Sequence, residues 1–260
     1  MSKLLSIENY NVKDWKEKFP DGKNDISQLE IDYSWKWAKK ILDENPTSVE
    51  KINKIINICI SKDKKVFPYP DLVFNAFNSV DYDDVKVVIV GQDSYMNERD
   101  SVPEAMGMSF SIPIGIPIPS SLTNIYKNAV KFKRMFKYPE HGNLQFWASQ
   151  GVLLINSGLT VQQKCAGSHL VQWSWFTDRV IEYLSKDKDK LVFVLWGKYA
   201  ADKRKLIDTK KHKVIVTSHP SGLSVNTPYE GKSFASFDHF GQINTYLKEM
   251  NKTEIVWQII

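Results

Sequence analysis

Four short apolar runs are the feature of this chain that most constrains its fold. They occupy residues 85–90, 151–155, 191–196 and 214–217, and segments long enough for helices separate them. Hydrophobicity is continuous along each run rather than alternating, so we expect strands that are covered on both faces. This pattern predicts an α/β fold: a three-layer sandwich in which helices flank a central four-stranded parallel sheet.

The residues before these runs have a helical pattern. Apolar side chains recur at three- and four-residue spacing from Val49 to Ile60, after a capping-box sequence at 47–50, and residues 28–43 suggest a second packed helix. Cys59 falls on the apolar stripe, which favours a core thiol over a nucleophile. With no repeat and no Gly/Ser linker in the chain, we expect a helical N-terminal extension, residues 1–65, packed on a main domain of residues 66–260.

Composition excludes several classes of protein. The longest apolar runs fall far short of the roughly 18 residues of a membrane span. The N-terminus lacks the apolar stretch of a signal peptide, so we expect an intracellular protein that is not secreted. Two cysteines cannot build a disulfide framework or a Cys-rich metal site. The net charge of +5, from 35 basic and 30 acidic residues, permits a polyanionic partner without requiring one.

Polar residues follow the apolar runs at the points where strands would end. Asp93 comes after the first run, Asn156 after the second, the Gly197 turn after the third and His219 after the fourth. Carboxyl ends of parallel strands meet at one edge of a sheet, so these groups should converge there. For any single strand end, ordinary loop chemistry is the simpler interpretation, but all of them together favour an active site.

Motif absences narrow the chemistry of that site. The chain has no phosphate-binding loop, no dinucleotide fingerprint and no H-x-x-x-H spacing. The remaining possibility is chemistry by a carboxylate and a histidine, without a metal or a cofactor. Asp93 can stabilise a developing cation or orient a water, and His219 can stabilise a developing anion. Such a pair suits cleavage of a glycosidic bond through an oxocarbenium-like transition state.

Five motifs follow one another between residues 66 and 257. They read VVIVGQDSY (87–95), SSLTNIY (120–126), GVLLINSGLTV (151–161), LWGKYA (195–200) and HPSGLS (219–224). In this order they resemble the water-activating motif (usually GQDPYH), the end of the proline-rich loop, the uracil-recognition strand, the glycine–serine loop and the minor-groove loop (usually HPSPLS) of the uracil-DNA glycosylase superfamily, in its major UNG-type branch. The resemblance implies hydrolysis of the N-glycosidic bond of uracil in DNA, which leaves an abasic site for base excision repair.

Carried over residue by residue, the resemblance implies two catalytic groups. Asp93 supports the cationic sugar and positions the attacking water, and neutral His219 donates to uracil O2 as the base leaves. Asn156 pairs with N3 and O4 of uracil, which rejects cytosine because its donor pattern is opposite. The other implied uracil-binding groups are the stacking ring of Phe110, the side chain of Tyr95, which excludes the thymine methyl, and the backbone of Gln92.

The resemblance also implies DNA contacts and partners. Leu223 would enter the minor groove as a wedge that replaces the flipped nucleotide. The residues implied to face phosphates are Ser121, Gly197, Lys198, Ser221 and Ser224. We expect a monomer that needs no cofactor or metal, acts on uracil in single- and double-stranded DNA, and is compatible with a replication or polymerase partner.

Two other functions and one local alternative stay open from the sequence. A non-catalytic DNA-binding or polymerase-associated factor could use the same fold, although a scaffold would need neither Asp93 nor Asn156. An enzyme for another damaged base or a small nucleoside is disfavoured by Tyr95, Asn156 and Leu223 together. Ser121 has the simpler alternative role of capping the following helix.

The chain departs from the family pattern beside the predicted catalytic groups. Ser94 stands where the motif usually has proline, which predicts a looser turn after Asp93. Met96 replaces a histidine, and Gly222 replaces a proline, which predicts a more mobile wedge loop. We expect retained activity with weaker DNA binding or slower capture of the base.

Overall fold

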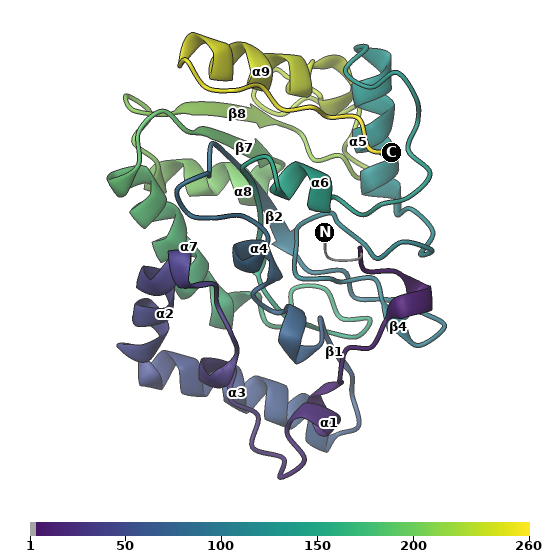
Figure 1. Ribbon diagram of the computed structural model, residues 1–260, viewed down its shortest axis with the longest axis vertical. Coiled ribbons are helices and arrows are strands. Elements are labelled where there is room, and N and C mark those ends of the chain that lie inside the picture. Colours follow the sequence, from purple (N-terminus) through teal and green to yellow (C-terminus); the bar gives the residue numbers. More distant parts are fainter. Residues whose placement is uncertain (1–3) are drawn as a thin grey trace.

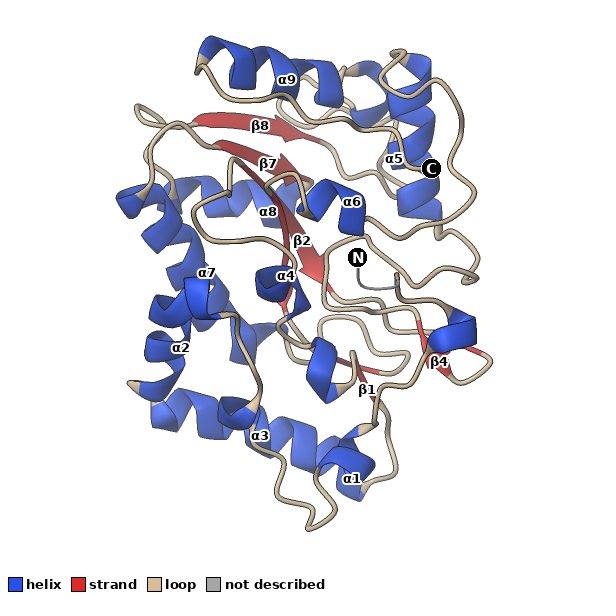
Figure 2. Cartoon of the chain, in the orientation of Figure 1, coloured by secondary structure: helices blue, strands red, loops and turns tan. Residues whose placement is uncertain are grey.

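The computed structural model of the chain describes residues 4–260, and its centre is a parallel sheet. The sheet contains β2 (Val87–Asp93), β5 (Val152–Gly158), β7 (Val192–Trp196) and β8 (Lys213–Thr217) in the order β5-β2-β7-β8. Each neighbouring pair is parallel, and Figure 2 shows β2, β7 and β8 side by side. The predicted α/β fold with four parallel strands is therefore confirmed.

Two of these strands run further than the apolar pattern predicted. Gly91 pairs with Asn156, and Asp93 pairs with Gly158, so the polar residues after the apolar runs still belong to β2 and β5. The backbone ladder continues although side-chain hydrophobicity has ended, because ladder hydrogen bonds do not depend on the side chain. The predicted site residues Asp93 and Asn156 thus stand on adjacent, registered strands.

Helices flank the sheet (Figure 1). The helix α7 (Leu170–Asp187) packs on β5, and α2 (Lys36–Asp43) and α3 (Pro46–Ser61) pack on α7. Elsewhere α9 (His239–Glu249) packs on β7 beside α5 (Ser120–Lys131). The shorter helices are α1 (Trp15–Lys18), α4 (Asn75–Asn78), α6 (Gln145–Ala148) and α8 (Lys198–Ala201).

The remaining elements are short. β1 (Val66–Phe67) pairs with β6 (Val161–Gln162), and β3 (Glu98–Arg99) pairs with β4 (Val102–Pro103), both antiparallel. The 3-10 helices are Ile7–Asn9, Ile26–Gln28, Tyr33–Trp35, Pro70–Leu72, Asp202–Leu206 and Phe234–Ser236.

Side chains from residues 15–59 belong to the same hydrophobic core as those of the rest of the chain. The fully buried Trp15 donates its indole N–H to the carbonyl of Val66 at 3.1 Å, and the buried Trp35 donates to the carbonyl of Val80 at 2.8 Å. Buried indole N–H groups need such partners, so these bonds anchor the N-terminal segment. Cys59 is buried, as predicted for a core thiol.

Two helix starts differ from the sequence prediction. The helix α3 begins at Pro46 after Asn45, with no side-chain cap, so the predicted capping box at 47–50 is wrong. Proline lacks an N–H and has a helical φ, which makes it a natural first residue. Only residues from Lys36 onward form the second predicted helix, because the Asp32 side chain accepts from the Ser34 N–H and holds a separate 3-10 turn.

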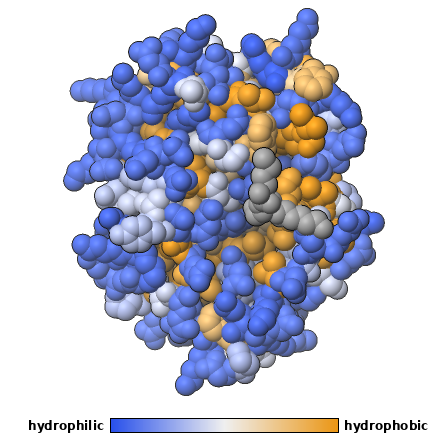
Figure 3. All heavy atoms as spheres, in the orientation of Figure 1, coloured by the Kyte–Doolittle hydropathy of each residue, from blue (hydrophilic) through white to orange (hydrophobic). Residues whose placement is uncertain are grey.

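Hydrophilic residues cover most of the face in Figure 3, and hydrophobic residues gather near its middle. Within residues 4–260, no helix combines the length and apolar character that crossing a membrane requires.

Candidate active site

The Asp93 carboxylate lies at the carboxyl end of β2, against the loop before α7. Its Oδ2 accepts a hydrogen bond from the backbone N–H of Gly167, and its buried Oδ1 accepts none from residues 4–260. Burial raises the pKa of the Asp93 carboxyl above its ordinary value, and the Gly167 N–H partly offsets this rise. Asp93 is therefore held from one side, in surroundings where its charge is poorly solvated.

The His219 ring follows β8 at the same edge of the sheet. Its Nδ1 accepts a hydrogen bond of 3.0 Å from the N–H of Ser221, so the proton of the neutral ring resides on Nε2. Burial lowers the pKa of His219, which keeps the ring neutral near pH 7. Gly197 makes room for it: φ is +88° there, and a Cβ would come within 2.9 Å of the His219 Cβ.

Phe110 is held in a conformation that bulky residues rarely adopt. Its φ is +63°, and its ring centroid lies 5.5 Å from that of Trp196 and 6.0 Å from that of His219. The Tyr95 hydroxyl donates to the Phe110 carbonyl at 3.4 Å. Backbone strain of this kind persists only where the surroundings enforce it, and it is frequent at functional sites.

Trp196 is a site residue to which the sequence analysis assigned no role. Its indole N–H donates to Nδ1 of the buried His239 at 3.1 Å, and Nε2 of His239 lies 3.1 Å from the Phe234 carbonyl. This chain of contacts fixes the indole that packs against Phe110. The signal available in the sequence was the LWGKYA motif at 195–200, which contains Trp196.

Asn156 and Ser94 contact each other across β2 and β5. The Asn156 amide is 5% exposed, and its Nδ2 lies 3.5 Å from the Ser94 Oγ. Ser94 is 6% exposed and donates to the Leu159 carbonyl at 3.1 Å. The hydroxyl thus connects the turn after Asp93 to the residue that follows β5, and the looser turn expected from the missing proline stays a prediction.

A cleft of about 510 Å³ gathers many of the predicted residues. It is lined by Gln92, Trp196, Gly197, Lys198, Tyr199, Ala200, Asp202, His219, Ser221 and Ser224. Leu223 projects beside it with 96% of its side chain exposed, as a wedge residue would. Opposite charges are present at the rim, since Lys198 and Asp202 both line the cleft.

Ser121 reaches this region through α5 rather than through the cleft lining. It lies in the first turn of α5, and Asn124 one turn later donates to the Pro220 carbonyl at 2.8 Å. The helix begins after Pro119 without a side-chain cap, so the alternative role of Ser121 as an N-cap is wrong.

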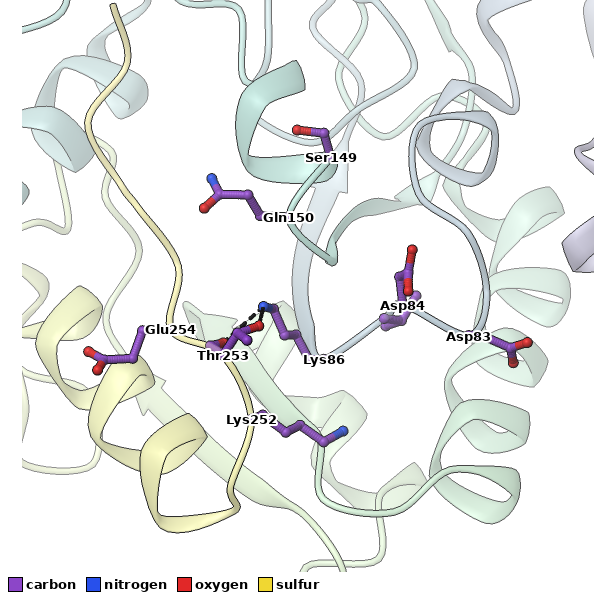
Figure 4. A pocket seen from close by; sticks show the side chains of 9 residues that line it. Asp83, Asp84, Lys86, Ser149, Gln150, Lys252, Thr253 and Glu254 are labelled. Carbon is purple, nitrogen blue, oxygen red and sulfur yellow. Dashed lines mark hydrogen bonds between the residues drawn. The ribbon is translucent and has the colours of Figure 1, made fainter.

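A second hollow, of about 500 Å³, lies near the amino ends of β2 and β5, away from the carboxyl ends where the predicted site lies. None of the predicted site residues lines it (Figure 4). Lys86, just before β2, donates there to the Thr253 carbonyl at 2.9 Å. Acidic and basic residues both line it, including Asp84, Lys252 and Glu254. Within residues 4–260, no group of three or more His, Cys, Asp or Glu side chains is placed to hold a metal.

A carboxylate, a neutral imidazole donor and a buried amide at the carboxyl ends of parallel strands are the groups expected of an α/β enzyme that hydrolyses N-glycosidic bonds. Residues 77–248 match the family described as "Uracil DNA glycosylase superfamily", and the chain belongs to this superfamily.

Similar proteins agree with this assignment. The chain is 39% identical to the "Probable uracil-DNA glycosylase" of Acanthamoeba polyphaga mimivirus, over 98% of this chain and 72% of that protein. It is 43% identical to the "Uracil-DNA glycosylase" of Campylobacter fetus, over 90% of this chain and 96% of that protein. The crystal structure of mimivirus uracil-DNA glycosylase superimposes with a TM-score of 0.93 at 39% identity, covering 98% of this chain and 97% of that one.

These findings confirm the prediction of a uracil-DNA glycosylase, an enzyme of DNA repair, over the alternative of a non-catalytic DNA-binding factor. The roles of the individual site residues and the N-terminal domain boundary stay predictions.

Proposed function

We propose that this chain hydrolyses the bond between uracil N1 and deoxyribose C1′ in DNA, with Asp93 and His219 as its catalytic residues. The observation that carries the proposal is the Ser221 N–H donating to His219 Nδ1. It leaves Nε2–H of a neutral ring as the donor toward the base. A neutral donor can stabilise the uracil anion without first giving up a proton.

In the reaction, the C1′–N1 bond breaks and its electron pair stays on uracil. The Asp93 carboxylate faces the positive charge that develops on the sugar and accepts a hydrogen bond from the attacking water. Oxygen of that water bonds to C1′, one of its protons passes to solvent or to Asp93, and the uracil anion is protonated after release. Poor solvation of Asp93 strengthens its interaction with the cationic sugar.

Base recognition is assigned to the groups around Asn156. Its amide pairs with N3–H and O4 of uracil, the Phe110 ring stacks on the base, and Tyr95 occupies the space near C5. The Gln92 backbone completes this set. The short path from Tyr95 to the strained Phe110 backbone supports a pocket of defined width, which a thymine methyl would not fit.

DNA contacts are assigned to the rim of the cleft. Leu223 fills the space of the flipped nucleotide, and the phosphate-facing set is Ser121, Gly197, Lys198, Ser221 and Ser224. Both single- and double-stranded DNA are proposed substrates, for a monomer that acts wherever its genome lies. Phosphate contacts predict affinity that falls steeply as salt is added. A replication or polymerase partner stays a prediction.

The test is excision of uracil from a single-stranded oligonucleotide in excess EDTA, with abasic sites cleaved by alkali. Wild type should cleave at uracil, and Asp93→Asn should lose most of this activity while keeping its DNA affinity and fold. Absence of cleavage by folded, DNA-binding wild type would reject the proposal. Loss of activity on chelation alone would reject the metal-free mechanism.

A further inference from the structure

The proposed mechanism assigns no role to Ser94, although its side chain is buried beside Asn156. Its hydroxyl donates to the Leu159 carbonyl at 3.1 Å and lies 3.5 Å from the Gly158 carbonyl. On its other side it faces Asn156 Nδ2 at 3.5 Å. The usual proline of the motif has no hydroxyl and would make none of these contacts, so they belong to this chain's own sequence.

The number of protons on these groups determines which of them donates and which accepts in each hydrogen bond. A serine hydroxyl has a single proton and two lone pairs. That proton is directed at carbonyl oxygens of β5 and the residue after it, so the hydroxyl can only accept from Asn156. A flipped Asn156 amide would point Oδ1 at this oxygen, and the two would repel unless Ser94 gave up its bond to Leu159.

Gly91 confines the other half of the same amide. It pairs with Asn156 in the sheet, and a Cβ on residue 91 would collide with Asn156 Oδ1. The amide oxygen therefore occupies the space beside the Gly91 Cα, and the amide nitrogen lies on the Ser94 side.

We propose that Ser94 is a positioning residue that holds the Asn156 amide in the orientation that reads uracil. The proposal rests on the proposed function, in which Asn156 pairs with N3–H and O4. A flipped amide would offer a donor to N3 and an acceptor to the exocyclic amine, which is the pattern that cytosine presents. Ser94 thereby contributes to the choice between uracil and cytosine without touching either base.

The test compares Ser94→Ala and Ser94→Thr in the full chain, with Ser157→Ala as a matched control. Ser157 is also a buried serine beside Asn156, and its Oγ has no hydrogen-bond partner within residues 4–260. Values of kcat and KM are measured for uracil, and cytosine excision is measured in the same oligonucleotide context with excess enzyme. Melting temperatures verify that each variant is folded.

We expect Ser94→Ala to lower kcat/KM for uracil about five- to tenfold and to raise the cytosine-to-uracil ratio by at least that factor. Ser94→Thr keeps the hydroxyl and should restore the wild-type ratio, and Ser157→Ala should not change it. An unchanged ratio in Ser94→Ala, or an equal change in Ser157→Ala, would overturn the proposal.

A measurement without turnover separates this inference from the proposed function. In protein labelled with ¹⁵N-asparagine, the Asn156 side-chain signals are followed while free uracil or free cytosine is added. Wild type should prefer uracil, and Ser94→Ala should lose part of that preference. Equal preferences in the two proteins would overturn the role of Ser94 whether or not wild type excises uracil, whereas failed excision alone would count only against the proposed function.

Discussion

The Oδ1 oxygen of Asp93 occupies the space that a side chain on Gly158 would need. The two residues pair across β2 and β5, and a Cβ built on Gly158 would lie 2.7 Å from that oxygen. The absence of a side chain at position 158 is therefore what allows the carboxylate to keep its place beside Gly167.

Replacing Gly158 with alanine should displace the Asp93 carboxylate. We expect Gly158→Ala to lower kcat roughly 100-fold with little change in KM, since a shift of about 1 Å at a reacting group has effects of this size. Steady-state kinetics on a uracil oligonucleotide measures the effect. In an Asp93→Asn background the same change should add little, because its effect operates through the carboxylate. Fully additive losses would contradict this explanation.

Leu223 should matter for duplex DNA and not for folding. Its side chain is 96% exposed, so Leu223→Ala should change the free energy of unfolding by less than about 0.5 kcal/mol. Excision from duplex DNA should fall about tenfold or more, and excision from single strands should fall less, because a single strand has no paired stack to refill. The control is Phe136→Ala, which alters another exposed apolar residue, at 83%, and should leave both activities unchanged. Equal losses on both substrates would argue against the wedge.

The pH dependence of kcat/KM should have an acid limb only. Burial raises the pKa of Asp93 and lowers that of His219, and the mechanism requires the ionised carboxylate and the neutral ring. Both forms are lost as pH falls, so activity should rise through the acidic range and level off near neutrality. His219→Asn should show a shallower limb, since one titrating group is gone. If kcat/KM instead fell as the pH rose from 6 to 8, His219 would be acting as a cation, contrary to the proposal.

His239 should make folding stability sensitive to acid. Burial lowers its pKa from 6.5 to about 3, so below pH 6.5 the unfolded chain takes up a proton that the folded chain refuses. The stability it contributes is complete above about pH 6.5 and is lost as pH falls toward 3. Between pH 7 and 4.5, protonation of this one residue in the unfolded chain should lower the free energy of unfolding by roughly 2.5 kcal/mol.

Urea unfolding at the two pH values tests this dependence. His239→Gln should be less stable than wild type at pH 7, because the contacts to Trp196 and Phe234 are lost, yet it should lose less stability on acidification. Parallel losses in the two proteins would assign the pH dependence to other groups.

The sequence alone was sufficient for the sheet and for the groups at its edge. Continuous apolar runs identified four buried strands, and the order of the polar residues after them placed Asp93, Asn156 and His219 at one rim. This worked because strand burial and strand ends depend on the residues of the strand itself. Motif resemblance then supplied the family, which the comparisons confirmed.

Local patterns failed where a structural detail depended on a distant partner. The hydrogen bond from the Ser94 hydroxyl to the Leu159 carbonyl joins residues 65 positions apart, and the sequence around Ser94 does not predict it. Neither the left-handed backbone of Phe110 nor the Gly167 N–H on Asp93 has a signal in the residues nearby. The sequence determined which chemical groups this protein brings to the carboxyl ends of its strands. The tertiary structure decided how those groups are oriented, which of them are protonated and how much space surrounds them. Those properties depend on burial and on hydrogen-bond partners that meet only when distant segments pack together.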